Sequence, residues 1–387
     1  MDSALKVLWP VQMPRASESI YSSKMNSVLS ITMNGMDKWK VATATAVCLL
    51  LIVSGLYVLE ITSKNGSSGY VDSDMSMWTD DSGTKEFLIP YLKSVTDEKS
   101  KDFIPVEDRI AVFDLDGTLF CERDPWYFDL CLYIHRVLED PDYKDKASEL
   151  EIEVALTQKE APSPGVLDDR MEIARALAFA GMTVDEMDEY IQEFKKTSMP
   201  SYEGMLRGEG FYRPMLQVVD ALVANQFTVY VVSGTDRLTV RALLEDSMLT
   251  LPSNQIIGSS KLLQAANQDK DGSKYVLKDD DEIIYAGEHV IKNLNINKVL
   301  AIIEEIGKQP VLSFGNSGSD SSMNLYTTNN NRYKSMAFML CCDDLERENG
   351  NMEAAQKMYD LCEQEGWIPV SMKNDWTTIY GDGVKKK

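Results

Sequence analysis

Basic residues are scarce in this sequence relative to acidic ones. Lysine and arginine together number 39 against 61 aspartates and glutamates, which gives a formal net charge of -22 at pH 7. Nucleic acids and anionic membrane surfaces attract proteins through patches of positive charge. The charge balance therefore argues against both as partners, and it carries no information about the fold.

Cysteine spacings typical of metal sites are also absent. The chain has six cysteines in 387 residues, and two of them, Cys341 and Cys342, are adjacent. Adjacent cysteines rarely bridge each other, so the sequence leaves disulfide pairing open. The chain shows no internal repeat. Its length and its hydrophobic content of 44% indicate a globular protein with a large core and more than one domain.

Long uncharged apolar runs are limited to one, VATATAVCLLLIVSGLYVL at 41–59. Its length is close to the roughly 20 residues that a bilayer core requires. Lys38 and Lys40 precede the run and mainly acidic residues follow it, a bias that keeps the N-terminus in the cytoplasm. We predict a single-pass transmembrane anchor at 39–61, with the rest of the chain extracytoplasmic. The alternative is a cleaved signal peptide and a secreted protein, although no clear Ala-x-Ala site follows the run.

The segments on either side of this run lack regular patterns. Residues 1–38 show no sustained periodicity and are predicted to form an N-terminal tail. Residues 62–84 are rich in Ser, Gly and Asp, which is typical of a flexible linker. The remainder, 85–387, alternates apolar strands with helical patterns. This alternation predicts an α/β domain whose mostly parallel sheet is covered on both faces.

A helical segment is expected to interrupt this domain at about 121–210. Asp124 is positioned as the N-cap of a helix whose first residue is a proline. Thr183 followed by Glu186 forms a capping box that begins another helix. The segment lies between two strands of the domain, so we expect it to form a cap over the site.

The clearest chemical signal lies at 109–119, RIAVFDLDGTL. Ile110 to Phe113 is a continuous apolar run, typical of a strand buried on both faces, and its carboxyl end is where open α/β sheets hold ligands. Asp114 and Asp116 follow, and residues i and i+2 of an extended segment point the same way. One carboxylate can attack phosphorus while the other transfers protons. Two carboxylates repel a phosphate, so this chemistry needs a cation such as Mg²⁺.

An ordinary turn or a fragment of a calcium-binding loop would also contain Asp-x-Asp-Gly. An EF-hand loop places its glycine sixth and lies between helices, whereas Gly117 is fourth in its motif and follows a strand. The segments downstream therefore decide between these interpretations.

Three further polar signals follow along the chain. Ser233 and Gly234 come directly after the β-branched strand 227–232, where a hydroxyl group and a helix N-terminus suit a phosphate oxygen. Lys298, in a predicted helix, is a candidate cation for the phosphate. The loop GNSGSD at 315–320 follows another short strand and is rich in oxygen ligands. Taken alone, the Ser-Gly pair is more often a turn and helix cap, Lys298 could be a solvated surface lysine, and the 315–320 loop could be a flexible turn.

Together the four signals resemble the haloacid dehalogenase-like hydrolase superfamily, in particular its phosphoserine-phosphatase-like members with a helical cap. They are DLDGT at 114–118, VVSGT at 231–235, Lys298, and GNSGSD at 315–320. The resemblance covers about 85–387 and implies a Rossmann-like core. It also implies a phosphatase that uses Mg²⁺ and an aspartyl-phosphate. A small phosphorylated metabolite is the expected substrate, because a large helical cap would crowd a bulky one.

The resemblance assigns catalytic roles to individual residues. It makes Asp114 the nucleophile and Asp116 the general acid and base. Ser233, with Gly234 beside it, would bind the phosphoryl group, and Lys298 would stabilise its charge.

The metal site is where this chain departs from the pattern. The resemblance implies Mg²⁺ ligands at Asp114, at Asp116 through its backbone carbonyl, at Asn316, and at Asp320 directly or through water. Such enzymes usually carry an acidic residue at the position of Asn316. An amide oxygen can still ligate Mg²⁺, but one negative charge is lost.

Two other functions remain open at this point. A binding or scaffold protein would keep the fold and lose turnover through Asn316, and a phosphotransferase would use an acceptor other than water. The cap is expected to select the substrate. Trp126 and Tyr127 at its start are candidates to contact the leaving group, although such aromatic residues more often belong to a core.

Overall fold

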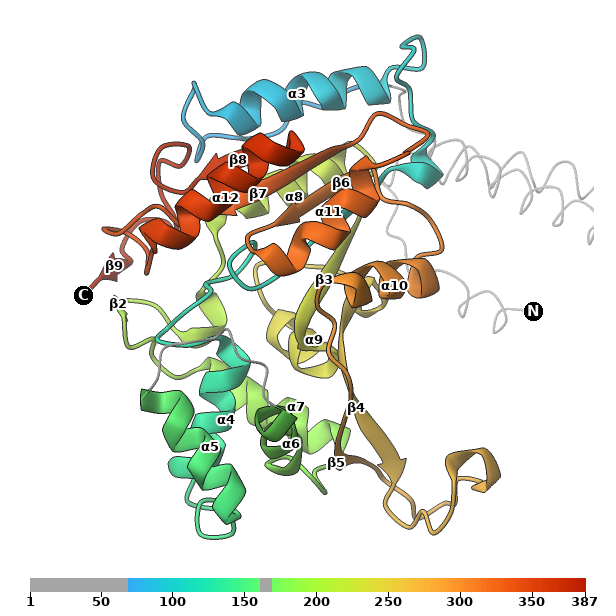
Figure 1. The fold of residues 1–387 in the computed structure, drawn as a ribbon, viewed down its shortest axis with the longest axis vertical. Helices are drawn as coiled ribbons and strands as arrows, with labels where there is room; N and C mark the ends of the chain where they lie inside the picture. Colours follow the sequence, from blue (N-terminus) through green and yellow to red (C-terminus); the bar gives the residue numbers. More distant parts are fainter. Residues whose placement is uncertain (1–68, 161–168) are drawn as a thin grey trace, which may run out of the picture. The chain divides into compact units, whose positions relative to one another are not determined.

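A seven-stranded sheet forms the centre of the protein (Figure 1). The structure is a computed structural model, and it describes residues 69–160 and 169–387. The strand order is β5-β4-β3-β1-β6-β7-β8, and every neighbouring pair is parallel except β4 and β5. The strands are β1 (Ile110–Phe113), β3 (Thr228–Asp236), β4 (Ile256–Ala265), β5 (Ile283–Ile291), β6 (Leu312–Gly315), β7 (Met336–Cys341) and β8 (Ile368–Ser371). The predicted α/β fold with a mostly parallel sheet is confirmed.

Helices cover both faces of this sheet (Figure 1). Successive side chains of a strand point to opposite faces, so the central strand β1 divides its residues between two cores. Phe113 belongs to the large cluster that includes residues of α3 and α8, whereas Val112 packs with Ile302 of α10 and Met323 of α11. The helices around the sheet are α3 (Gly83–Thr96), α8 (Arg213–Ala224), α9 (Arg237–Leu244), α10 (Ile296–Glu305), α11 (Ser321–Thr328) and α12 (Met352–Glu365).

Three stacked phenylalanines align the central strands. Phe113, Phe314 and Phe338 lie on β1, β6 and β7 and are paired directly across the sheet. Their ring centroids are 4.2 and 4.7 Å apart, with interplanar angles of 5° and 9°. Aromatic cross-strand pairs of this kind each contribute about 0.2–1 kcal/mol. The stack fixes the register of β1 against β6, so Asp114 and Gly315 emerge side by side at the carboxyl edge.

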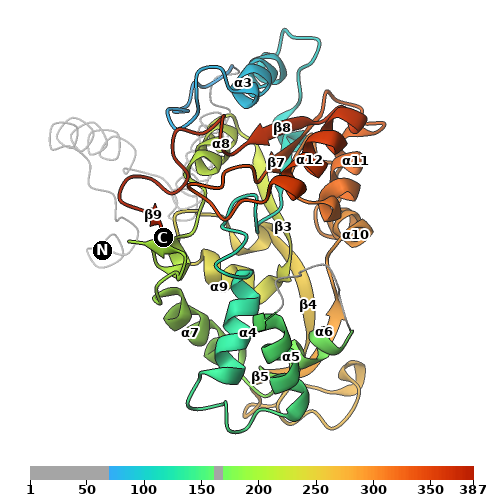
Figure 2. The ribbon, with the colours of Figure 1, turned by 60° about the vertical axis from the view of Figure 1, so that its left-hand side comes forward.

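Four helices between β1 and β3 form the cap (Figure 2). They are α4 (Phe128–Leu138), α5 (Glu149–Glu160), α6 (Asp169–Leu177) and α7 (Val184–Lys195). The capping box predicted for α7 is present, because Thr183 and Glu186 each accept the backbone N–H of the other. The predicted start of α4 is wrong by three residues. Asp124 caps no helix, and its Oδ1 instead accepts the backbone N–H of Ser201 at 2.7 Å.

The strands β4 and β5 join the cap to the sheet, a connection that the sequence analysis did not predict (Figure 2). The backbone N–H of Gly181 donates to the carbonyl of Tyr285, and that of Tyr285 to the carbonyl of Met182, both at 2.9 Å. Only the first part of β4 is continuously buried, and β5 is mostly exposed or half-buried. Strands of this kind lack the apolar run or regular alternation by which a sequence reveals them.

The end of the predicted linker packs against the domain. Trp78 is 2% exposed and meets Trp376 edge to face, with ring centroids 5.9 Å apart. Its indole N–H donates to the carbonyl of Pro214 at 2.9 Å. The prediction of a flexible linker at 62–84 is therefore wrong for residues 69–84. The prediction of a linker was based on the Ser, Gly and Asp content of the segment, and it gave no weight to Trp78, which is buried in the structure.

The predicted tail at 1–38 and the predicted anchor at 39–61 lie outside the described residues, as does the start of the linker. No helix in the described ranges is long and apolar enough to span a bilayer.

Replacing Trp78 by alanine tests the packing of residues 69–84. Burial of a large aromatic side chain predicts that Trp78→Ala lowers the free energy of unfolding by about 3–5 kcal/mol, measured by denaturant titration. Phe87→Ala is the matched control, because Phe87 on α3 is 45% exposed and its loss should cost about 0.5 kcal/mol or less. Equal unfolding midpoints for Trp78→Ala and the unmodified protein would show that this segment is not packed.

Candidate active site

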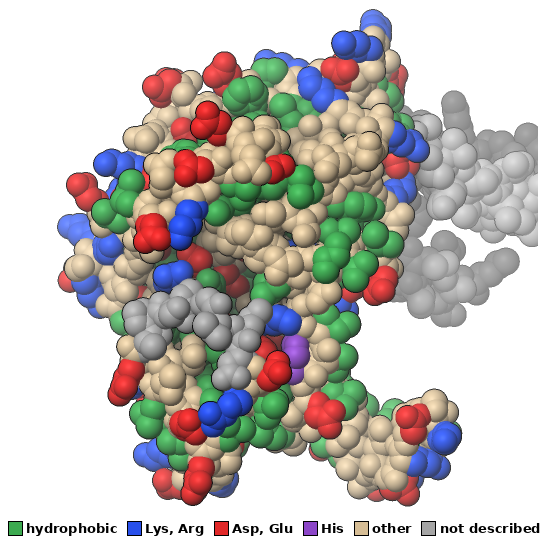
Figure 3. Space-filling model, viewed as in Figure 1, with side chains coloured by type: hydrophobic (Ala, Val, Ile, Leu, Met, Phe, Trp, Pro, Cys, Tyr) green, Lys and Arg blue, Asp and Glu red, His purple; other side chains and the backbone are tan. Residues whose placement is uncertain are grey.

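A cavity of about 530 Å³ lies between the carboxyl edge of the sheet and the cap. The space-filling view shows an indentation between these two parts, with acidic side chains inside it (Figure 3). Strand ends and loops of the core supply one wall, with Asp114, Asp116, Gly234, Thr235 and Asn316 among its residues. The cap and the chain leading to it supply the opposite wall, which includes Glu122, Arg123, Tyr127, Asp129, Leu130, Met171 and Arg175. Motifs about 200 residues apart in sequence therefore face one space.

Lys298 lies beneath this cavity and holds two of its motifs together. The side chain is fully buried, and its Nζ lies 2.5 Å from Asp114 Oδ1 and 2.7 Å from Asp320 Oδ1. Burial by itself would lower the pKa of Lys298, but the two carboxylates outweigh it and raise that pKa. Lys298 is therefore a permanent cation in the core, and the interpretation as a solvated surface lysine is wrong.

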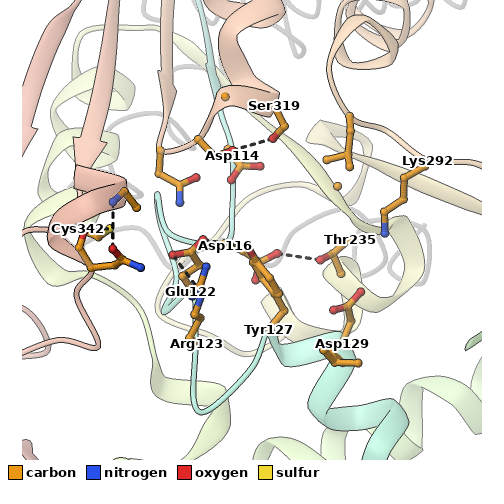
Figure 4. Close-up of a pocket in the computed structure, with 18 of the residues that line it drawn as sticks. Asp114, Asp116, Glu122, Arg123, Tyr127, Asp129, Thr235, Lys292, Ser319 and Cys342 are labelled. Atoms are coloured by element: carbon orange, nitrogen blue, oxygen red, sulfur yellow. Dashed lines mark hydrogen bonds and ion pairs between the residues drawn. The ribbon is translucent and has the colours of Figure 1, made fainter. Parts of the chain in front are cut away.

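The two aspartates of the first motif have different environments. Burial raises the pKa of Asp114 to about 7, against the opposing effect of Lys298. Burial also raises the pKa of Asp116 well above its usual value, and the nearby charges of Asp129 and Asp114 add to this. Thr235 donates a hydrogen bond from Oγ1 to Asp116 Oδ2 at 2.8 Å (Figure 4). Asp114 has a fixed cation as its partner and Asp116 a neutral hydroxyl, a difference that suits the two carboxyl groups to one basic and one acidic role.

The turn after Asp116 requires glycine for two reasons. Gly117 has a φ of +82°, which residues with a side chain rarely adopt. A Cβ at this position would also lie 1.9 Å from Asn316 Nδ2. The absence of a side chain thus allows Asn316 to pack against the turn that carries Asp116.

The structure does not bring the Ser233 hydroxyl into the cavity lining. Ser233 is fully buried, and its Oγ accepts the backbone N–H of Thr235 at 3.0 Å. The strand continues through Asp236, so Gly234 and Thr235 are the residues of this motif that reach the cavity. A Cβ on Gly234 would lie 2.5 Å from Leu294 Cδ2, so a larger residue there would require the Leu294 side chain to move.

Asp320 contacts protein donors with both carboxylate oxygens. Its Oδ1 pairs with Lys298, and its Oδ2 accepts the backbone N–H groups of Asn316 and Ser317 at 3.1 Å each. The residue is fully buried and does not line the cavity. Asp320 therefore holds the 315–320 loop in place, and in this conformation it does not present a ligand to the cavity.

The donors at the cavity fit a magnesium ion if amide and backbone oxygens are included. In the described ranges, no group of three or more His, Cys, Asp or Glu side chains is arranged to hold a metal. Mg²⁺ is bound through one or two carboxylates together with other oxygens and water. Asp114, Asp116 and Asn316 supply such oxygens. Burial, and secondly the neighbouring carboxylates, raise the pKa of both aspartates, and a bound cation would favour their ionised forms.

The sequence analysis assigned no role to several cavity residues. Thr235 was missed because the strand was expected to end at residue 232. Glu122 and Arg123 lie on an irregular stretch between Asp116 and the cap, where no periodicity marks a position. Of the two aromatic candidates, Tyr127 lines the cavity and Trp126 does not.

No family model and no curated protein matches this chain. Solved structures with a similar arrangement include a conserved protein of unknown function from Anaerococcus prevotii, at 13% identity and a TM-score of 0.44, over 72% of this chain and 88% of that one. Cytosolic 5'-nucleotidase IIIB bound to cytidine matches at 12% identity and a TM-score of 0.41, over 69% and 81% of the two chains. A probable phosphoserine phosphatase from Vibrio cholerae matches at 9% identity and a TM-score of 0.34, over 68% and 69%. At such low similarity these matches do not bear on function, and the proposed function rests on the site itself.

The raised pKa of Asp116 predicts a pH-dependent effect of Asp116→Asn on stability. A carboxyl group whose folded-state pKa lies above its unfolded value of about 4 stabilises the folded state only while protonated, and that contribution is lost as pH rises. In chelator, Asp116→Asn should therefore melt above the unmodified protein at pH 8, because asparagine keeps the size of the side chain and carries no charge. The difference should shrink at pH 5.5. A difference that does not change with pH would contradict the assigned environment.

Proposed function

We propose that this protein is a Mg²⁺-dependent phosphomonoesterase that acts through an aspartyl-phosphate. The observation that carries the proposal is the placement of the Asp114 carboxylate, which faces the cavity at the end of β1 and is held 2.5 Å from the Lys298 ammonium. Lys298 favours the ionised form of Asp114, as a nucleophile requires. Asp116 lies two residues further on and also lines the cavity.

The two aspartates have different roles in the proposed reaction. An oxygen of Asp114 attacks phosphorus, and the bond to the leaving oxygen breaks. Asp116, whose pKa is raised by burial, donates a proton to that oxygen. In the second step Asp116 takes a proton from water, which attacks the aspartyl-phosphate and releases phosphate. The hydrogen bond from Thr235 keeps the Asp116 carboxyl group oriented between these steps.

Magnesium would be held by Asp114, by the backbone carbonyl of Asp116 and by Asn316. When bound, the ion neutralises charge on the transferring phosphoryl group and on the carboxylates that surround it. The backbone around Gly234, together with Thr235, is the surface on which the remaining phosphoryl oxygens would lie.

The cavity supports a small phosphorylated metabolite as the substrate. Its volume of about 530 Å³ lies within the range of small-molecule sites. Cationic side chains at its wall, Arg123, Lys292 and Lys357, favour an anionic ligand in a protein of otherwise strongly negative charge. Leu130, Met171 and Met358 add apolar surface for the part of the substrate beyond the phosphate.

Phosphate release by the full-length chain tests this proposal. Over a panel of small phosphomonoesters, release should require Mg²⁺ and should stop in chelator. Asp114→Asn should reduce it about 10³-fold or more, because the nucleophile is lost while the size of the side chain is kept. The matched control is Asp185→Asn, an exposed residue at the start of α7, which should leave the rate unchanged.

The outcome of that assay also separates the two alternative functions. Transfer to added alcohols in preference to water would identify a phosphotransferase that uses the same residues. No turnover of any ester by the folded protein, with or without Asn316→Asp, would contradict the proposal and favour a binding or scaffold protein.

We further propose that residues 39–61 anchor the protein in a membrane, with the domain on the extracytoplasmic side. The support is the uncharged run at 41–59 and the lysines that precede it. Membranes washed with alkaline carbonate should retain the full-length chain, and in intact cells added protease should digest its domain. Release of the chain by carbonate would contradict the anchor, and recovery of a shortened chain from the medium would identify signal-peptide cleavage.

A further inference from the structure

The segment between β5 and α10, residues 292–295, holds the part of β3 that reaches the cavity. Asn293 in this segment is 1% exposed. Its side-chain amide donates from Nδ2 to the backbone carbonyl of Ser233 at 3.0 Å, and its backbone N–H donates to the Ser259 hydroxyl at 2.9 Å. That hydroxyl in turn donates to the carbonyl of Gly234 at 2.6 Å. Two side chains thus bind two successive carbonyls of β3.

These carbonyls lie where the pairing of β3 with β4 is irregular. The register shifts between Val232 and Asp236, so the regular ladder of backbone hydrogen bonds is interrupted there. Buried backbone carbonyls need hydrogen-bond partners. The Asn293 amide supplies one of them from the end of β5, and the Ser259 hydroxyl supplies the other from β4.

The direction of each carbonyl also sets the direction of the N–H group that follows it. The C=O and N–H of a trans peptide bond point in opposite directions. The hydrogen bond from Asn293 to the Ser233 carbonyl therefore directs the Gly234 N–H away from Asn293. Gly234 lines the cavity, where a carbonyl oxygen would repel a phosphate and an N–H group would bind it.

We infer that Asn293 and Ser259 are positioning residues for the proposed phosphatase reaction, and that they orient the backbone of residues 233–235 toward the phosphoryl group. The inference rests on the proposed function. Neither side chain lines the cavity, so each acts through the backbone that it binds. The same stretch of β3 orients the general acid, because the Thr235 hydroxyl donates to Asp116 at 2.8 Å (Figure 4).

The two positioning residues belong to the hairpin that joins the cap to the sheet. Ser259 lies on β4, and Asn293 follows the end of β5. The backbone of β5 is also hydrogen-bonded to the cap at Gly181 and Met182. One hairpin therefore holds both the cap and the surface on which the phosphoryl oxygens would lie.

Binding of inorganic phosphate to the full-length chain with Mg²⁺ tests this inference. Asn293→Leu keeps the approximate size of the side chain and removes its hydrogen-bond donor. Calorimetric titration should show phosphate affinity lowered about 10–100-fold, as expected for the loss of one hydrogen bond to a charged group. Ser259→Ala should have a similar effect, whereas Ser259→Thr keeps the hydroxyl group and should stay within about threefold of the unmodified protein.

Asn225→Leu is the matched control for a merely structural effect. Asn225 is 2% exposed, and its Nδ2 likewise donates to backbone carbonyls, those of Ala221 at 2.8 Å and Val71 at 2.9 Å. It lies before the start of β3, at the opposite edge of the sheet from the cavity. In thermal melting it should lose at least as much stability as Asn293→Leu, whereas its phosphate affinity should not change.

Unchanged phosphate affinity in Asn293→Leu or in Ser259→Ala would overturn the inference, and either variant suffices if the other does not fold. An equal loss in Asn225→Leu, or in Ser259→Thr, would also overturn it, because the effect would then come from general destabilisation or packing. Failure of the unmodified protein both to bind phosphate and to release it from any ester would instead contradict the proposed function.

Discussion

The ammonium group of Lys298 lies between two buried carboxylates, and the rest of the site depends on this placement. Its distances of 2.5 Å to Asp114 and 2.7 Å to Asp320 join a strand end, a helix and a loop that are far apart in sequence. Removing an ion from water costs several kcal/mol, and only close, well-oriented partners offset that cost. The sheet register and the packing of α10 must therefore hold three charged groups in place before any chemistry is possible.

The same low-polarity surroundings distinguish the two aspartates of the first motif. Asp114 faces a fixed cation, whereas Asp116 faces the charges of Asp129 and Asp114 and has a neutral hydroxyl, Thr235, as its partner. Two identical side chains two residues apart thus have different electrostatic partners. The difference comes from the neighbours that the fold supplies, because nothing in the local sequence distinguishes one carboxyl group from the other.

Much of this arrangement follows from the sequence, for a definite physical reason. Parallel strands bring their carboxyl ends to one edge, so the segments after β1, β3 and β6 had to meet there. That rule does not fix which atoms face the ligand. The pairing of β3 with β4 shifts register between Val232 and Asp236, and Ser233 within this irregularity is buried while Thr235 faces Asp116. The hairpin of β4 and β5 was missed because its exposed strands carry no apolar pattern.

Glu122 shows why the departure at Asn316 could not be interpreted from the motif alone. The two residues are 194 positions apart, and both side chains lie against the turn at Gly117, where a Cβ would be 1.9 Å from Asn316 Nδ2 and 3.3 Å from Glu122 Cβ. A sequence motif shows only the charged residues of one loop, whereas a metal ion interacts with all the charges around it. In this protein one of those charges comes from the segment that connects the core to the cap. The same segment carries Tyr127, so the electrostatics of the site and the position of the cap wall are set by one short stretch of chain.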